Sequence, residues 1–311
     1  MCAMDLQKGK LELQTGKGYK VEQHPDHHRL YHIEFESDVI DKFVADLKDV
    51  SDEQLEYVPY MRLMAADKLV ELVGEEFVQT IRGILHDRNT GGFTIGLQGR
   101  TKDDQDYVKF STALTHLVGT PNFDAMSGKY YARFTVKHTD DSDSYLRQAY
   151  RTFTLHTDGT YVDEPTDWLL MMKFEEENAV GGRSRLLHLD DWEEMDYFYN
   201  HPMAKYKFTY KAPASKNVSE DILRQTFYEH NNGPCICFID QFVYPETIDQ
   251  AKYLKDLSHS MENSPATIGL DLPEGDLIML NNHFWLHGRE AFEKNTELHR
   301  ELLRQRGRFA E

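Results

Sequence analysis

The chain has 311 residues, 40% of them hydrophobic, so it is long enough to bury a sizeable core and is not composed like a disordered protein. Its 35 basic and 53 acidic residues give a net charge of −18, which would repel nucleic acids and anionic membranes. Three cysteines, a polar start at residues 1–10 and no apolar run long enough to span a bilayer predict a reduced, cytoplasmic, soluble protein.

The first half of the chain reads mainly as helix. Residues 1–38 are predicted to form a variable, partly ordered segment, because residues 1–28 are polar and poorly periodic. Beyond them, apolar residues such as Ile40, Phe43 and Leu47 recur at helical spacing. The predicted helices are residues 39–49, 53–73, 76–87 and 104–118.

From about residue 129 the period changes to that of strands. Tyr130, Ala132, Phe134 and Val136 alternate with more polar neighbours, as in a half-buried strand. Further strands are predicted at 151–156, 167–174, 185–189, 205–210, 235–240, 266–272, 276–282 and 301–309, with helices at 191–199 and 246–260. No linker or repeat divides the chain, so residues 39–311 are predicted to form a single domain, mainly β with helices packed outside it.

One group of residues is typical of a metal site. His156 and Asp158 lie two apart in an extended segment, so their side chains can share one face. His287 is predicted to end another strand, and glycine follows both Asp158 and His287. Two histidines and one carboxylate leave coordination positions open and suit a non-haem Fe(II) that must also bind a co-substrate and O2.

Other histidines are weaker candidates. His188 lies among leucines and is predicted to belong to the core or to a strand face. His283 is four residues before His287, but no glutamate lies between them, so a hydrolase zinc site of the His-Glu-x-x-His kind is excluded.

The C-terminal segment is rich in arginine. If residues 300–308 form a strand, Arg300, Arg304, Arg306 and Arg308 share a face. Guanidinium groups gathered near a metal site favour an anionic ligand, because Arg–carboxylate contacts shielded from water are strong. A solvated position is predicted for Arg308, whereas at least one of the other three should bind a carboxylate.

Several segments resemble a known family. The His156-x-Asp158 pair with His287, the Gly181-Gly182-Arg183-Ser184 turn and the run from Gly275 to Arg289 resemble the taurine-dioxygenase/clavaminate-synthase group of Fe(II)/2-oxoglutarate oxygenases. Residues 122–128, 143–148, 188–192 and 304–307 closely resemble the CsiD family of glutarate 2-hydroxylases within it. The likeness extends from about residue 40 to the C-terminus.

The resemblance implies a double-stranded β-helix (jelly-roll) core with Fe(II) on His156, Asp158 and His287. It also implies that Ser184, which replaces the threonine of the group, donates a hydrogen bond to a carboxylate of 2-oxoglutarate. Arg300 and Arg304 fit the spacing of the arginines that bind 2-oxoglutarate and substrate, and Arg306 could exchange roles with either. No catalytic side chain beyond the metal ligands is expected.

The implied reaction uses 2-oxoglutarate and O2 to convert glutarate into 2-hydroxyglutarate, with the L product, and releases succinate and CO2. The resemblance further implies a role in lysine and glutarate breakdown and a homotetramer. Tyr130, Tyr131, Phe134 and Tyr161 are candidates for the pocket wall. Two alternatives are a 2-oxoglutarate oxygenase that acts on another small acid, and a non-enzymatic β-barrel that senses a dicarboxylate.

Overall fold

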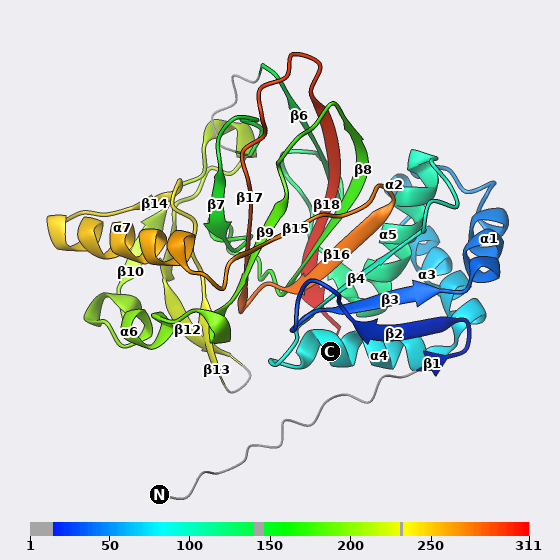
Figure 1. Ribbon diagram of the computed structural model, residues 1–311, viewed down its shortest axis with the longest axis horizontal. Coiled ribbons are helices and arrows are strands. Elements are labelled where there is room, and N and C mark those ends of the chain that lie inside the picture. Colours follow the sequence, from blue (N-terminus) through cyan, green and yellow to red (C-terminus); the bar gives the residue numbers. More distant parts are fainter. Residues whose placement is uncertain (1–14, 140–145, 231–232, 311) are drawn as a thin grey trace, which may run out of the picture.

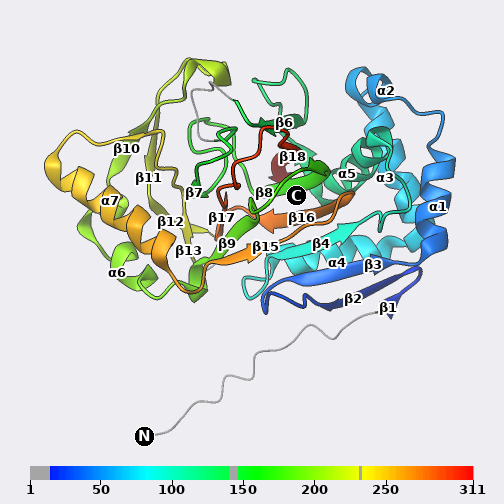
Figure 2. The same ribbon diagram turned by 45° about the horizontal axis from the view of Figure 1, so that its top comes forward.

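A computed structural model describes residues 15–139, 146–230 and 233–310. A nine-stranded sheet forms its centre, and Figures 1 and 2 show a group of helices packed beside that sheet. In order, its strands are β1 (Thr15–Gly16), β2 (Tyr19–Gln23), β3 (Tyr31–Phe35), β4 (Gly92–Gly96), β16 (Asp276–Asn281), β8 (Trp168–Glu177), β18 (His299–Phe309) and β5 (Gly119–Pro121), with β6 (Ala132–Lys137) also paired to β18.

A second sheet of four strands faces the first, in the order β15 (Ile268–Leu270), β9 (Ser184–His188), β17 (Trp285–Arg289) and β7 (Phe153–His156). Two smaller sheets lie beyond it. They consist of β11 (Ile222–Gln225), β10 (Lys207–Tyr210) and β14 (Val243–Tyr244), and of β12 (Phe227–His230) and β13 (Gly233–Ile236). The architecture is mainly β and of the jelly-roll type, as predicted, and the described strands do not close into a barrel.

Helices cover the two ends of this arrangement. Five pack beside the main sheet, and two lie beside the small sheets (Figure 1). They are α1 (Ser37–Asp46), α2 (Asp52–Tyr57), α3 (Tyr60–Val73), α4 (Glu75–His86) and α5 (Asp104–Val118), then α6 (Met195–Tyr199) and α7 (Ile248–Asn263). One apolar core joins the first group to the main sheet, and another lies under the four-stranded sheet. None of the helices among the described residues is long and apolar enough to cross a membrane.

Local chemistry explains where the helices begin and end. Ser51 caps α2 by accepting from the backbone N–H of Gln54, whose side chain accepts from the N–H of Ser51. The helix predicted over 53–73 is wrong in one respect: Pro59 disfavours helical backbone at Val58, and the segment divides into α2 and α3. The prediction for α5 is confirmed at both ends.

The strand predictions were less complete. The segment 15–35 contributes β1–β3 to the main sheet, and the alternation of apolar and polar residues along β2 and β3 was missed. The strand β4 was also missed, because all five of its residues are buried and it lacks alternation. The strand predicted at 235–240 has different bounds in the structure: β13 begins at Gly233 and ends at Ile236. The division into residues 1–38 and a domain at 39–311 stays a prediction, and residues 1–14 lie outside the described residues.

The strand β18 positions the arginines. Leu303 and Gln305 are buried on the side of α5, where Gln305 contacts Ser111 and Thr115. Even-numbered residues therefore point to the opposite side of the sheet, toward β7 and β17. Because of this alternation, the arginines of β18 lie on one face of the sheet, as the sequence predicted.

Candidate metal centre and carboxylate pocket

Two histidines from distant parts of the chain meet across the second sheet. His156 is the last residue of β7, and its direct partner in the antiparallel ladder is His287 of β17. The prediction that His287 ends a strand is wrong: it lies at the centre of β17, because a turn at 282–284 separates β16 from β17. Asp158 lies just beyond β7, before Gly159, whose φ of 79° suits the sharp turn that follows.

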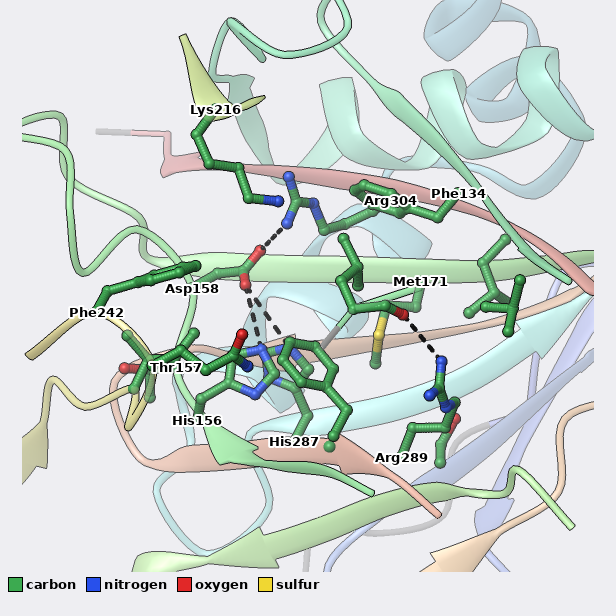
Figure 3. A pocket seen from close by; sticks show the side chains of 18 of the residues that line it. Phe134, His156, Thr157, Asp158, Met171, Lys216, Phe242, His287, Arg289 and Arg304 are labelled. Carbon is green, nitrogen blue, oxygen red and sulfur yellow. Dashed lines mark hydrogen bonds and ion pairs between the residues drawn. The ribbon is translucent and has the colours of Figure 1, made fainter. Parts of the chain in front are cut away.

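The three side chains converge on one point. The Nε2 atoms of His156 and His287 each lie 3.7 Å from Asp158 Oδ1, and the three ligand atoms lie within 4.8 Å of one another (Figure 3). These separations are too long for hydrogen bonds. They leave the space between the three atoms free for a single cation.

The protonation states suit a metal. Burial is the main cause that lowers the pKa of both histidines, so that both imidazoles are neutral. His156 Nδ1 donates to the carbonyl oxygen of Thr154 (2.8 Å), which leaves the lone pair on Nε2. Burial alone would raise the pKa of Asp158, but the guanidinium groups of Arg304 and Arg306 outweigh it and hold that pKa well below its usual range.

The side chain of Asn282 forms hydrogen bonds with the backbone of Asp158. Its Oδ1 accepts from the Asp158 N–H (2.9 Å), and its Nδ2 donates to the carbonyl oxygens of Asp158 (3.0 Å) and Thr166 (2.8 Å). The side chain of Asn282 is buried. The sequence drew attention to the Asn281–Asn282 pair only as part of a motif, and this clamp gives Asn282 a specific position in the site.

The ligand set fits a metal that keeps coordination positions open. Asp158 Oδ2 is buried and accepts no hydrogen bond, although Arg304 Nη1 forms an ion pair with it at 3.0 Å. Only these three ligand groups converge here among the described residues, whereas a structural zinc site is usually closed by four. Two neutral imidazoles and one carboxylate on one face are the donor set of non-haem Fe(II) centres.

The arginines of β18 occupy two different places in the pocket. Arg300 is buried beside the glycine turn, where its Nη1 donates to the Gly182 carbonyl oxygen and its Nε lies 3.2 Å from Glu176 Oε2. Ser184, two residues after Gly182, lines the same pocket as Arg300 and the three candidate ligands. This end of the pocket therefore contains both the Ser184 hydroxyl and the Arg300 guanidinium group.

Arg304 lies at the other end, and Arg306 lines an adjoining cavity that Arg304 shares. Arg304 donates to Asp124 Oδ2 (2.6 Å) and also faces Asp158. Arg306 is buried, and its Nε and Nη1 have no hydrogen-bond partner. Arg308 is exposed, as predicted. Within the described residues, Arg300 and Arg304 therefore have carboxylate partners, whereas Arg306 has no carboxylate within 4.0 Å.

The predicted pocket wall is correct in half of its members. Phe134 and Tyr161 line the pocket. Tyr130 and Tyr131 are instead buried in the core shared with the helices, where the Tyr130 hydroxyl contacts Thr112.

The other histidines have structural positions. His188 is fully buried in the second core, and its Nδ1 accepts from the Asp190 N–H. His283 pairs with Asp167 at 3.0 Å and with the Tyr228 hydroxyl at 2.6 Å, away from the three ligands. Both findings agree with the sequence interpretation.

The sequence reasoning missed three charged residues of the pocket: Asp124, Lys216 and Arg289. Asp124 and Arg289 lay inside quoted motifs, whereas Lys216 is an isolated lysine with no sequence signal. Arg289 donates to the carbonyl oxygens of Leu146 (2.9 Å), Gln148 (2.7 Å) and Arg151 (3.2 Å). It therefore fastens the segment 146–151, which supplies Leu146 to the pocket.

Solved structures with the same fold are non-haem iron oxygenases. An asparagine oxygenase in complex with Fe(II), (2S,3S)-3-hydroxyasparagine and succinate aligns with a TM-score of 0.71, at 11% identity over 87% of this chain and 90% of that one. The oxygenase OrfP in complex with Fe and α-ketoglutaric acid aligns with a TM-score of 0.64, at 14% identity over 87% and 91% of the two chains. The fold is therefore that of the jelly-roll, non-haem iron oxygenases.

Closer relatives identify the family. Residues 19–309 match the CsiD family model. A glutarate 2-hydroxylase of Citrobacter koseri is 43% identical over 91% of this chain and 88% of its own length. A glutarate 2-hydroxylase of Klebsiella pneumoniae is 41% identical over 94% and 91%. The chain belongs to the CsiD family.

Proposed function

We propose that this protein is an Fe(II)/2-oxoglutarate-dependent dioxygenase that hydroxylates glutarate at C2, forming 2-hydroxyglutarate, succinate and CO2. The main observation behind the proposal is that three candidate ligand atoms converge inside a buried pocket. That pocket is also lined by Arg289, Arg300 and Arg304, and Asp158 is the one carboxylate among its described lining residues. The names of the two relatives, which cover about nine-tenths of the chain, support glutarate as the substrate.

In this proposal His156, Asp158 and His287 hold the iron. When bound, iron would supply the activation of O2 that is coupled to the oxidative decarboxylation of 2-oxoglutarate. The protein's part is to bind the two acids in fixed positions and to exclude water. Phe134, Tyr161 and neighbouring apolar side chains form the dry wall that this requires.

Each end of the pocket would bind a carboxylate of one of the two acids. Arg300 and Ser184 would hold the distal carboxylate of 2-oxoglutarate, which is supported by the contact of Arg300 with Gly182 in the turn that leads to Ser184. Arg304 and Arg306 would then hold a carboxylate of glutarate, near Asp158. Two fixed carboxylates orient C2 for reaction, and small errors in such placement reduce rates strongly.

The remaining proposals concern the setting of the enzyme. We place it in the cytoplasm and in the breakdown of lysine and glutarate, with the L enantiomer as product. Cys235 and Cys237, which are not in a disulfide, are in accord with a reducing compartment.

We also propose a homotetramer. Tyr57, Tyr60, Leu63 and Met64 are exposed on α2 and α3, where a second subunit would cover them. Light scattering should give a mass near four times the 36.3 kDa of the chain. A monomer mass would contradict this part of the proposal.

The decisive test measures succinate release by the Fe(II)-loaded protein with 2-oxoglutarate, ascorbate and O2, with and without glutarate. Glutarate-stimulated turnover with 2-hydroxyglutarate as product is expected, and chiral chromatography identifies the enantiomer. Stimulation by another small acid but not by glutarate would retain the oxygenase and reject the substrate. Binding of 2-oxoglutarate or glutarate without O2 consumption would favour a dicarboxylate sensor.

A further inference from the structure

Lys216 enters the pocket from a different part of the chain than the arginines do. It is the last residue of a short 3-10 helix (Ala214–Lys216) between β10 and β11, and its side chain is buried. The next residue, Asn217, has left-handed backbone (φ 53°) and donates from Nδ2 to the Ala125 carbonyl oxygen (3.1 Å). This contact ties the loop to the segment that carries Asp124.

Lys216 faces the candidate metal centre. It lines the pocket that contains His156, Asp158 and His287, and also the adjoining cavity that contains Arg306. In Figure 3 its ammonium group points toward the Arg304 guanidinium, beside Asp158. Lys216 and the arginines of β18, which come from different parts of the chain, thus line the same cavity.

The ammonium group of Lys216 has no carboxylate partner. Its hydrogen bond goes to Met126 Sδ at 3.7 Å, a weak acceptor, and no described carboxylate forms an ion pair with it within 4.0 Å. The two other buried lysines of the described chain do have such partners: Lys109 lies 3.5 Å from Asp106 and Lys173 lies 2.7 Å from Glu176. Burial, followed by repulsion from Arg304, lowers the pKa of Lys216 to about 8, so the charged form is held at a cost.

The local charges leave room for one more anion. Lys216, Arg304 and Arg306 carry three positive charges, and the buried carboxylates of Asp124 and Asp158 carry two negative ones, which leaves 3 − 2 = +1 among the buried groups. Glu164 also lines the adjoining cavity, but it is exposed to solvent. Arg304 already engages both carboxylates. A buried cation without a partner is unfavourable, so an incoming carboxylate between Lys216 and the arginines would be strongly stabilised.

We propose that Lys216 binds the far carboxylate of the acid substrate together with the β18 arginines, and thereby selects dicarboxylates over acids of the same length whose far end is neutral. This inference rests on the proposed function, since it names a residue that sets the specificity of that same site. A neutral end group would leave the lysine buried and unpaired. The site therefore discriminates against an acid with a neutral end, because such an acid leaves the Lys216 ammonium group without a carboxylate partner.

The test compares glutarate with its monoamide, which has the same shape but one neutral end. The variants are Lys216→Met, which keeps the apolar stem and removes the charge, and Lys216→Arg, which keeps the charge. Lys211→Met is the matched control, because Lys211 lies in the same loop but is exposed and pairs with Asp221 at 2.9 Å. Calorimetric binding of each acid to the metal-free protein provides a readout independent of turnover, and kcat and KM are measured on the iron-loaded enzyme.

We expect the wild-type protein to bind glutarate at least about tenfold more tightly than the monoamide, as a charge-assisted hydrogen bond predicts. The Lys216→Met protein should lose most of this preference through a higher Kd and KM for glutarate, while Lys216→Arg restores part of it. The control should behave as wild type. Thermal melting should show Lys216→Met folded, because it removes a buried unpaired charge.

Two failures are distinguishable. If the wild-type enzyme shows no glutarate-stimulated succinate release, the proposed function is wrong. If the wild-type enzyme turns over glutarate but Lys216→Met discriminates between the two acids as well as the wild type does, the inference about Lys216 is overturned and the function stands.

Discussion

Replacing Asn282 with leucine separates two roles of one side chain, because its carboxamide both fills a buried site and fixes the backbone of Asp158. Leucine has a similar size but makes none of the three hydrogen bonds of 2.8–3.0 Å. At roughly 0.5–1.5 kcal/mol each, their loss should reduce the free energy of unfolding by about 1.5–4.5 kcal/mol. Since residues that support a ligand typically change metal affinity 10- to 100-fold, we expect a loss of about that size.

The matched control is Asn281→Leu. Asn281 is equally buried and makes two comparable bonds, to the Leu85 carbonyl oxygen and from the His283 N–H, both 3.0 Å, but it does not contact Asp158. Urea denaturation measures stability, and competition of the folded proteins with a chromophoric chelator for Co(II) measures metal affinity. Both variants should lose stability, and only Asn282→Leu should lose metal affinity. Equal affinity losses in the two variants would refute the clamp.

Three further outcomes are expected. Asp158→Ala should abolish glutarate-dependent succinate release, and full activity with stoichiometric iron would contradict its assignment as a ligand. Arg289→Met removes three hydrogen bonds to the segment 146–151, so amide exchange there should accelerate at least about tenfold while exchange in α5 stays unchanged; equal protection would reject the fastening role. Burial, followed by repulsion from His28, lowers the pKa of His27 to about 4, below its value in the unfolded chain. The contribution of neutral His27 to the free energy of unfolding is therefore fully present above pH 6.5 and declines toward pH 4, because the unfolded state takes up the proton first. The decline should be about 2 kcal/mol smaller in His27→Gln, as urea denaturation across this pH range would show, and identical pH profiles would contradict the attribution.

The parts of the fold that the sequence predicted are those whose pattern is local. The helix α5 was predicted at both ends; Asp103 caps its start by accepting from the Gln105 N–H, and Gly119 follows its last residue. The strands β1–β3 were missed; they pair locally with one another, and only the pairing of β3 with β4, about sixty residues further along the chain, joins them to the main sheet. The contact that joins such a segment to its sheet is tertiary, and a short window of sequence does not contain it.

The same division applies to the site. The spacing of His156 and Asp158 and the alternation of the arginines on β18 are local signals, and the predicted groups do come together. The partner of Arg304, the clamp by Asn282 and the burial of Lys216 depend on segments that meet only in the folded chain. Charge at a single lysine does not indicate burial, so no sequence signal could have drawn attention to Lys216.

The direct pairing of His156 with His287 has a consequence for how the protein acquires its metal. The two residues are 287 − 156 = 131 positions apart, so the chain must close a very long loop before both imidazoles face one point. A slip of β17 by one residue would turn His287 to the other side of the sheet. The strands β7 and β17 must therefore be paired in this register before one ion can contact both imidazoles. Loading then becomes a competition among the divalent ions of the cell, in which copper, nickel and zinc bind such ligands more tightly than Fe(II) does, and the supply of each metal decides which one occupies the site.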